Sequence, residues 1–242
     1  MATKKPHYRR ISLKLSGEAL MGEKTFGIDP TVLKAVSKEI HNVHRAGVEI
    51  AIVVGGGNIF RGLNSSEYSM GRVPADHMGM LATLMNAIAL GEALNNLGTE
   101  TRIMSAIDMN KIAEPFIRKR AIRHLEKNRI VLFGAGTGNP FFSTDTAAAL
   151  RAMEIHADVL LKATKVGGVF DSDPEKNPLS KPFKRLTYQE FLNKGLQVMD
   201  MTAVSLAMEQ KLPIIVFNLR EKGNIKRVVL GQSVGTLISG EE

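Results

Sequence analysis

Short apolar runs of strand length alternate with stretches of helical spacing along most of the 242-residue chain, and this alternation constrains the fold more than any other feature. One helical stretch begins at Asp29-Pro30 and ends at Gly47. The strand-like runs are Ile11–Leu15, Ile50–Val54, Ile103–Met104, Ile130–Phe133, Val159–Leu161 and Ile214–Phe217. The alternation predicts a three-layer α/β/α sandwich with a largely parallel central sheet.

The composition fits a soluble globular chain that forms one large domain or two small ones. Hydrophobic residues make up 44% and charged residues 23%, and there is no cysteine to form a disulfide, a thiolate nucleophile or a Cys-based metal site. The most apolar long stretch, Met78 to Leu94, includes Thr83, Asn86 and Glu92, so it predicts a buried helix rather than a membrane span. We see no secretion signal and expect a cytoplasmic protein.

The excess of positive charge favours anionic partners. Lys and Arg number 32 against 24 Asp and Glu, a formal net charge of +8. The basic stretch from Arg118 to Arg129 lies on and after a predicted helix, where such a run is usually a solvated face and occasionally a nucleic-acid footprint. A nucleic-acid-binding regulator therefore stays open as an alternative, although nucleic acid is the less favoured partner.

Three glycine-bearing loops each follow a predicted strand. They are Lys14 to Gly17, Gly55 to Asn58, and Gly134 to Asn139. In a parallel α/β sheet ligands bind at the carboxyl ends of the strands, and glycine lets backbone N–H groups approach an oxyanion closely. Because the sequence has no Gly-Lys-Ser/Thr and no complete Rossmann fingerprint, the pattern predicts an anion site that is neither a P-loop nor a dinucleotide site.

Five motif-bearing stretches follow one another along nearly the whole chain: Lys14 to Leu20, Gly55 to Gly62, Asp76 to Met80, Gly136 to Phe142 and Lys162 to Val166. Together they resemble the bacterial-type uridylate (UMP) kinases of the amino acid kinase family. Asp76 to Met80 and Thr137 to Phe142 are specific to the uridylate kinases, whereas the glycine triplet and the loop Lys162 to Val166 are shared with kinases of glutamate, aspartate, acetylglutamate or carbamate. A relative that phosphorylates a carboxylate or carbamate is therefore the alternative enzyme.

The resemblance implies transfer of the γ-phosphoryl group of ATP to UMP in pyrimidine nucleotide biosynthesis, giving UDP and ADP. It also implies a single domain, residues 1–242, with an acceptor-binding lobe at about 1–160 and a nucleotide-donor lobe at about 161–242. The implied ATP-binding residues are Lys14, Leu15, Ser16, Gly17, Gly57, Arg61, Thr164, Phe170 and Asp173. The implied UMP-binding residues are Gly56, Arg61, Asp76, Thr137, Gly138, Asn139, Pro140, Phe141, Phe142, Ser143 and Thr144.

The same resemblance assigns catalysis to Lys14, Lys162, Asp145 and Arg61. The two lysines are the cations expected to neutralise charge on the transferring group, and Asp145 orients them. A plainer role for Asp145 is a favourable interaction with the dipole of the helix that follows. No general base is needed, because the acceptor is already an anionic phosphate oxygen. Mg²⁺ is expected to arrive with ATP, and no metal site is predicted in the protein itself.

The resemblance further implies a homohexamer that GTP activates and UTP inhibits. The segment implied in the response to these effectors is Gly22, Glu23, Lys24, Thr25, Phe26 and Gly27, which reads equally well as a surface loop. One departure from the family pattern is Gly167, which stands where uridylate kinases usually carry aspartate.

Overall fold

The computed structural model describes residues 5–60 and 70–240, so Arg61 lies outside the described residues. Within these ranges the strands form one nine-stranded sheet in the order β4-β3-β5-β2-β1-β6-β8-β9-β7. Neighbouring strands pair in parallel except β8 and β9, which are antiparallel. The strands are β1 (Arg10–Leu15), β2 (Glu49–Val54), β3 (Thr101–Ser105), β4 (Glu114–Pro115), β5 (Ile130–Gly134), β6 (Val159–Thr164), β7 (Arg185–Thr187), β8 (Ile214–Asn218) and β9 (Thr236–Ser239).

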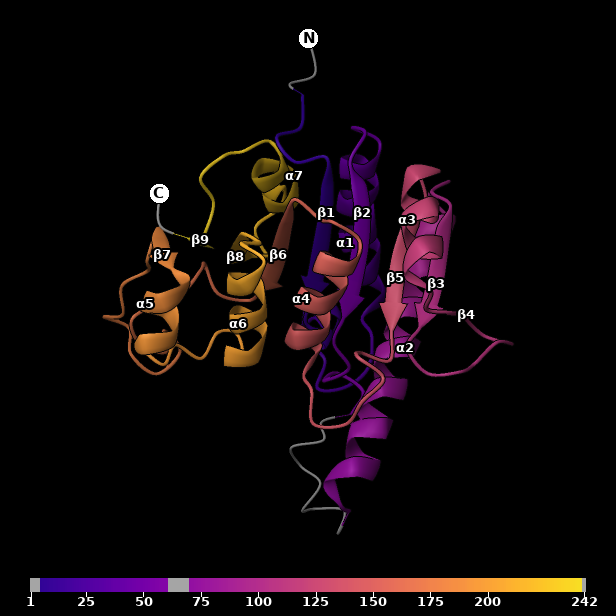
Figure 1. Ribbon diagram of the computed structural model, residues 1–242, viewed down its shortest axis with the longest axis horizontal. Helices are drawn as coiled ribbons and strands as arrows, with labels where there is room; N and C mark the ends of the chain where they lie inside the picture. The colour runs from indigo at the N-terminus through magenta and orange to yellow at the C-terminus, as the bar shows by residue number, and fades with distance from the viewer. Residues whose placement is uncertain (1–4, 61–69, 241–242) are drawn as a thin grey trace.

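Helices cover both faces of this sheet (Figure 1). α1, α2 and α7 pack on one face, and α3, α4, α5 and α6 pack on the other. The helices are η1 (Gly17–Leu20), α1 (Pro30–His44), α2 (Arg72–Asn95), α3 (Arg118–Glu126), α4 (Thr144–Glu154), α5 (Tyr188–Asn193), α6 (Met201–Glu209) and α7 (Asn224–Val229). The predicted three-layer α/β/α sandwich with a largely parallel sheet is confirmed.

The central strands are buried on both faces, which is why β2, β5 and β8 read as continuous apolar runs, whereas β1 alternates apolar with polar residues. In β1, Ile11, Leu13 and Leu15 belong to the core beneath α1 and are fully buried. The residues between them face α4 on the other side, where the Ser12 hydroxyl donates to the carbonyl of Ala148. The same alternation turns Lys14 toward α4, and this orientation builds the site described below.

Local capping signals in the sequence mark helix starts correctly. Asp29 is the N-cap of α1 and accepts from Thr31 N at 2.7 Å, and Pro30 is the first residue of the helix. Thr187 and Glu190 form a reciprocal capping box at the start of α5. These side chains satisfy backbone N–H groups that the first helical turn leaves without partners.

The buried helix predicted from Met78 to Leu94 is present but is buried on one side only. The segment belongs to the 24-residue helix α2, whose one side packs on the sheet. Its other side exposes apolar residues three or four positions apart, with Met85 55% and Leu81 44% exposed. Among the residues that the structure describes, none of the helices has the length and apolar character needed to cross a membrane.

Candidate active site

Two lysines and one aspartate meet at the carboxyl ends of β1 and β6. The parallel register pairs Lys14 with Lys162, so both side chains leave the sheet at the same level and on the same face. Asp145, in the first turn of α4, lies against both of them. Its Oδ1 is 2.8 Å from Lys14 Nζ, and its Oδ2 accepts a hydrogen bond from Lys162 Nζ. The structure thus brings together the described members of the predicted catalytic set.

This cluster is buried and carries a net positive charge. The side chains of Lys14, Lys162 and Asp145 are 9%, 8% and 13% exposed. Burial alone would raise the pKa of Asp145, but the charges of Lys14 and Lys162 outweigh it and lower that pKa to about 2. Burial and then the charge of Lys14 lower the pKa of Lys162 to about 8, although Asp145 opposes the shift. Below that pH, both lysines are charged and share the carboxylate of Asp145, while Asp200 adds a further negative charge that acts on Lys162.

Asp145 is held in place by the N-terminus of its helix. Ser143 is the N-cap of α4, and its Oγ accepts from the backbone N–H groups of Asp145 at 3.0 Å and Thr146 at 3.2 Å. The Ser143 hydroxyl in turn donates to Asp200, the N-cap of α6. Asp200 also accepts from Thr146 Oγ1 at 3.0 Å. The carboxylate of Asp200 therefore joins two helix N-termini next to the lysine pair.

Sequence reasoning did not single out Asp200 as part of this site. The available signal was an aspartate immediately before the apolar stretch of α6, which marks an N-cap. That signal says nothing of its partners Ser143 and Thr146, which lie more than fifty positions earlier in the chain.

The first two glycine loops touch one another beside the lysines. A Cβ atom added to Gly17 would lie 2.4 Å from Asn58 Oδ1 and 2.8 Å from the carbonyl oxygen of Gly55. Only glycine at position 17 permits this close approach of the loop after β1 and the loop after β2. Ser16 caps the short helix η1 that follows, where its Oγ accepts from Ala19 N at 3.2 Å.

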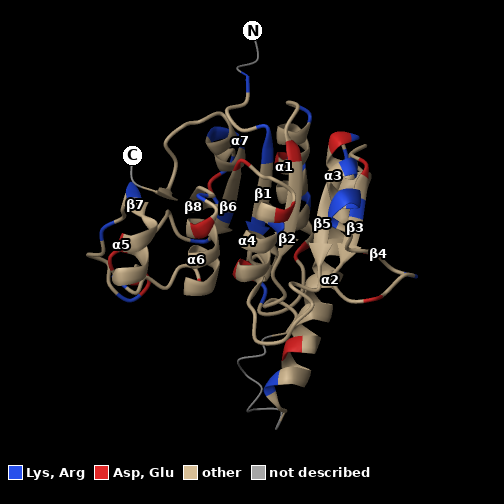
Figure 2. Ribbon diagram, viewed as in Figure 1, with Lys and Arg blue, Asp and Glu red and all other residues tan. Residues whose placement is uncertain are grey.

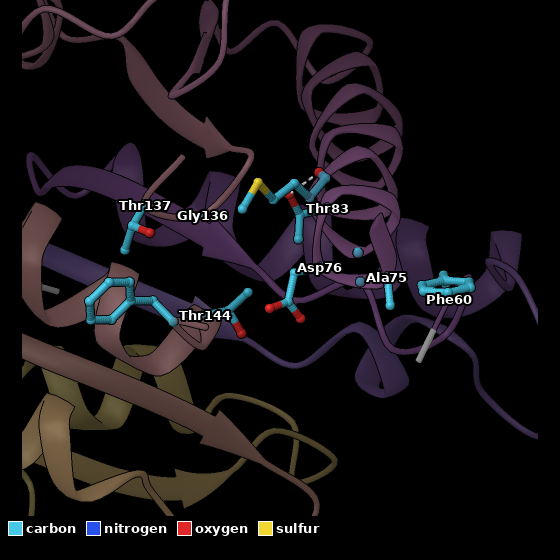
Figure 3. A pocket seen from close by; sticks show the side chains of 11 residues that line it. Phe60, Ala75, Asp76, Thr83, Gly136, Thr137 and Thr144 are labelled. Atoms are coloured by element: carbon cyan, nitrogen blue, oxygen red, sulfur yellow. Dashed lines mark hydrogen bonds between the residues drawn. The ribbon is translucent and has the colours of Figure 1, made fainter. Parts of the chain in front are cut away.

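A pocket of about 130 Å³ lies between the glycine loop, α2 and the loop after β5. In Figure 3 the Asp76 carboxylate lies in the middle of the lining residues, with Thr137 and Thr144 to one side and Phe60 to the other. Thr144 is the chain neighbour of Asp145, so the pocket adjoins the charged cluster. Of the predicted UMP-binding residues, those that line this pocket are Gly56, Asp76, Thr137, Phe142 and Thr144.

Asp76 already has partners within the protein. Its carboxylate accepts from Arg72 Nε at 2.8 and 2.9 Å and from the backbone N–H of Phe141 at 2.7 Å. The Arg72 guanidinium also lies 5.9 Å above the ring of Phe141. Asp76 thus ties α2 to the loop that connects β5 with α4. The resemblance implied that Asp76 binds UMP but did not reveal these two neighbours.

The loop after β5 carries unusual backbone conformations. Ala135 and Phe141 have φ values of 62° and 73°, a left-handed region that non-glycine residues rarely adopt. Thr83 of α2 accepts from the N–H of Ala135 at 2.8 Å and so holds the loop where it leaves the strand. Phe141 is 66% exposed, and Phe142, which lines the pocket, is 52% exposed. The remaining predicted UMP-binding residues of this loop are Gly138, Asn139, Pro140 and Ser143.

Three of the predicted ATP-binding residues lie at the end of β6 and after it. Thr164 is the last residue of β6, and its carbonyl oxygen accepts from Leu219 N at 2.8 Å. Phe170 pairs with Pro182 in an isolated bridge, and Asp173 is exposed on the loop between them. The predicted effector segment, 22–27, follows η1, and its Phe26 is 65% exposed.

The basic stretch on α3 is partly neutralised by neighbouring groups. In Figure 2 much of the α3 ribbon is blue, the colour of Lys and Arg positions. Arg118 Nε donates to the carbonyl of Glu154 at 2.7 Å, Arg120 lies 3.8 Å from Glu114, and Arg129 lies 2.9 Å from Glu100. These contacts are typical of a solvated helix face that packs at the end of a sheet.

Comparison with known proteins agrees with this geometry. The model of the amino acid kinase family matches residues 9–218. A UMP kinase from Bacillus anthracis is 41% identical with a TM-score of 0.94, over 97% of each chain. A UMP kinase from Ureaplasma parvum is 36% identical with a TM-score of 0.89, over 96% of this chain and 98% of that one. A uridylate kinase from Archaeoglobus fulgidus is 28% identical with a TM-score of 0.75, over 95% and 99%.

The matched region contains the whole charged cluster and all three glycine loops, and the chain belongs to the amino acid kinase family. Within that family, the solved structures named above that are similar to it from end to end are UMP and uridylate kinases.

Proposed function

We propose that the protein transfers the γ-phosphoryl group of ATP to UMP and forms UDP and ADP in pyrimidine nucleotide biosynthesis. The observation that carries this proposal is the Lys14–Asp145–Lys162 cluster, buried at the carboxyl ends of adjacent parallel strands and adjoining a pocket lined by Asp76 and Thr144. The near full-length similarity to UMP kinases supports UMP as the acceptor over a carboxylate or carbamate.

In the proposed reaction, an anionic phosphate oxygen of UMP attacks the γ-phosphorus of ATP. A bond forms between them while the bond from the γ-phosphorus to the bridging oxygen breaks, and ADP leaves with that electron pair. No proton has to be removed from the acceptor. Catalysis then depends on alignment and on stabilising the charge on the transferring group. The chain supplies fixed cations for that task, already oriented before the substrate arrives.

Lys14 and Lys162 are the two cations in this proposal, and Asp145 is a positioning residue. Their ammonium groups project from adjacent strands, so without a carboxylate between them they would repel each other in a buried setting. Asp145 contacts both and leaves the remaining N–H donors of each lysine to bind phosphate oxygens. Arg61, the fourth predicted catalytic residue, lies outside the described residues and stays a prediction.

Backbone groups of the glycine loops complete the proposed phosphate site. Ser16 and Gly17 would receive the phosphates of ATP, and Gly56 would receive the phosphate of UMP. A Cβ on Gly56 would lie 2.8 Å from both Ala82 Cβ and the carbonyl oxygen of Gly79, so this backbone lies directly on α2. Closely packed glycine backbones offer N–H donors to an anion without a side chain in the way.

The pocket is proposed to take the nucleoside part of UMP. Its volume of about 130 Å³ is smaller than the roughly 300 Å³ at the lower end of ligand sites, so it fits part of a nucleotide. Asp76 can accept from ribose hydroxyls, and the polar groups of Thr137 to Asn139 can pair with the edge of a pyrimidine. Adenosine of ATP would lie against Thr164, Phe170 and Asp173.

Mg²⁺ enters this proposal with ATP, as part of the substrate. Among the residues that the structure describes, no group of three or more His, Asp or Glu side chains is placed to hold a metal ion. An ion bound by phosphate oxygens and water needs no such cage. His41 and His44 bind Thr99 and backbone carbonyls instead.

We also propose that the enzyme assembles into a homohexamer in the cytoplasm. The exposed apolar side of α2, formed by Val73, Met78, Leu81, Met85 and Ile88, supports a subunit contact, because a continuous apolar stripe on a surface helix favours burial against a partner. Activation by GTP and inhibition by UTP remain predictions.

The direct test is ADP formation from Mg-ATP with UMP, dUMP, CMP, glutamate and carbamate in parallel reactions. We expect turnover with UMP to exceed turnover with glutamate or carbamate by at least a factor of about 1000, since those acceptors lack the groups that the pocket would pair. Turnover with glutamate or carbamate and none with UMP would replace the proposed acceptor. A nucleic-acid-binding regulator would instead show salt-dependent DNA binding and no turnover.

A further inference from the structure

Two buried asparagines lie beneath the glycine loops and are not used by the proposed chemistry. Asn58 directly follows the loop Gly55–Gly57, and Asn86 lies on the sheet side of α2, with exposed fractions of 2% and 0%. Each side chain donates from Nδ2 to the Oδ1 of the other, at 3.0 and 2.7 Å. Burying two carboxamides is unfavourable unless their polar atoms form hydrogen bonds, and these two carboxamides form hydrogen bonds with each other.

The remaining donors of the pair hold two backbone segments. Asn86 Nδ2 also donates to the carbonyl of Gly55 at 2.7 Å, and Asn58 Nδ2 donates to the carbonyl of Gly27 at 2.9 Å. All four side-chain N–H groups and both side-chain oxygens are therefore engaged. Turning either amide by 180° would set donor against donor and acceptor against acceptor. The pair consequently has one arrangement and fixes the Gly55 carbonyl relative to α2.

The same pair touches the loop assigned to the ATP phosphates. Asn58 Oδ1 lies 2.4 Å from where a Cβ of Gly17 would be, so its carboxamide packs directly on that residue. The N–H of Gly55 donates to the carbonyl of Leu15 at 2.8 Å, which links the two loops a second time. One buried amide pair thus contacts the Ser16–Gly17 loop, the Gly55–Gly57 loop and α2.

We propose that the Asn58–Asn86 pair is a positioning device that sets the glycine loop Gly55–Gly57 against the Ser16–Gly17 loop, and with it the alignment of the two phosphates. This inference rests on the proposed function, because it assigns these loops to ATP and UMP. Loss of the pair shifts backbone N–H groups without removing a group that contacts substrate. A misplacement of about 1 Å costs up to about 100-fold in rate, so the loss appears in kcat more than in KM.

The test is Asn86→Asp, which keeps the shape of the side chain but turns an oxygen toward the Gly55 carbonyl. We expect kcat with Mg-ATP and UMP to fall about 10-fold to 100-fold, with each KM changed less than about threefold. The matched control is Leu90→Ala, one turn further along the buried side of α2. That variant loses core packing and stability, but kcat of its folded fraction should stay within about twofold of wild type.

Hydrogen exchange of single amides gives a second readout that does not depend on turnover. In Asn86→Asp we expect exchange to rise about tenfold or more at the N–H groups of Gly27, Gly55 and Ile59, with the β1 amides unchanged. In Leu90→Ala the rise should be spread over the sheet. If Asn86→Asp does not fold, Asn86→Ser replaces it in both measurements.

A folded Asn86 variant with wild-type kcat and wild-type exchange in these loops would overturn the inference and leave the pair a purely structural contact. Wild-type protein that does not turn over UMP would refute the proposed function instead. In that case the exchange measurement still decides whether the pair fixes the two loops.

Discussion

At the scale of single residues, the structure is organised around one carboxylate between two ammonium groups. Lys14 and Lys162 are paired in register across β1 and β6, so their proximity follows from the strand order. The Asp145 carboxylate offsets the repulsion between the two ammonium groups and so stabilises the buried pair. Removing one partner from a buried charged set is costly, because the remaining charges are left in a medium of low dielectric constant.

Asp145→Asn should therefore destabilise the protein by about 3 kcal/mol near neutral pH. The pKa of Asp145 in the folded protein, about 2, lies below its ordinary value of 3.8, so its ionisation stabilises the fold above about pH 4. This contribution is lost as the pH falls from about 4 toward 2. Urea denaturation at several pH values measures it, with the exposed Glu209→Gln as the control. Equal stability of Asp145→Asn and wild type at pH 7 would contradict the prediction.

The charge of Lys162 makes the proposed activity sensitive to alkaline pH. Its pKa of about 8 means that the free enzyme loses this cation as the pH rises through 8, and kcat/KM should fall tenfold per pH unit above that point. Lys162→Arg keeps its positive charge across this range, so its kcat/KM should not change with pH there. The value should be lower than that of wild type, because a planar guanidinium differs in shape from an ammonium group. A pH profile of kcat/KM for both proteins measures this. Identical alkaline limbs would show that another group titrates.

At the scale of elements, the core strands of the sheet and the capped helices were predictable from the sequence. The runs that became β2, β5, β6 and β8 read as continuous apolar stretches, and the run that became β1 reads as an alternating one; all five strands are buried on both faces. β4, β7 and β9 were not predicted. β4 has two residues and β7 has three, which is too few to show a period. These two strands lie at the two ends of the sheet and form by pairing with the strand next to them.

The candidate site was predictable only in part, for a related reason. Lys14, Asp145 and the glycine loops lie at strand ends and helix starts, which local patterns mark. The contact of Ser143 with Asp200, and that of Asn58 with Asn86, join residues 57 and 28 positions apart. No local pattern carries such pairings, since they depend on how α6 and α2 pack. Resemblance to known kinases supplied the roles of Lys162 and Asp76, which spacing alone did not.

The N-cap of α4 links an element to the chemistry, and Ser143→Ala tests this link. Loss of the cap should lower stability by about 1 kcal/mol and also lower kcat, because the backbone that carries Asp145 loses two hydrogen bonds. Thr187→Ala removes the capping box of α5, away from the site, and is the matched control. It should lose similar stability at unchanged kcat. Equal kcat values for the two variants would show that the N-cap of α4 does not contribute to catalysis.

At the scale of the whole molecule, the exposed apolar side of α2 is the feature that the fold of a single chain leaves without a packing partner among the described residues. A subunit contact there predicts that wild-type protein sediments far above the 26.4 kDa of one chain. Met85→Glu places a charge in the middle of the apolar stripe and should lower the sedimenting mass, since an unpaired charge in an interface is unfavourable. Sedimentation at a single 26.4 kDa species for wild type would refute the assembly.

The central claim is that the buried lysine pair drives phosphoryl transfer to UMP. The measurement that tests it most directly is UDP formation from Mg-ATP and UMP by wild type, by Lys14→Met and by Lys38→Met, an exposed lysine on α1 that serves as the control. We predict rapid UDP formation by wild type and Lys38→Met, and a loss of at least about 100-fold in kcat for Lys14→Met. Folded Lys14→Met that forms UDP at the wild-type rate would contradict the account.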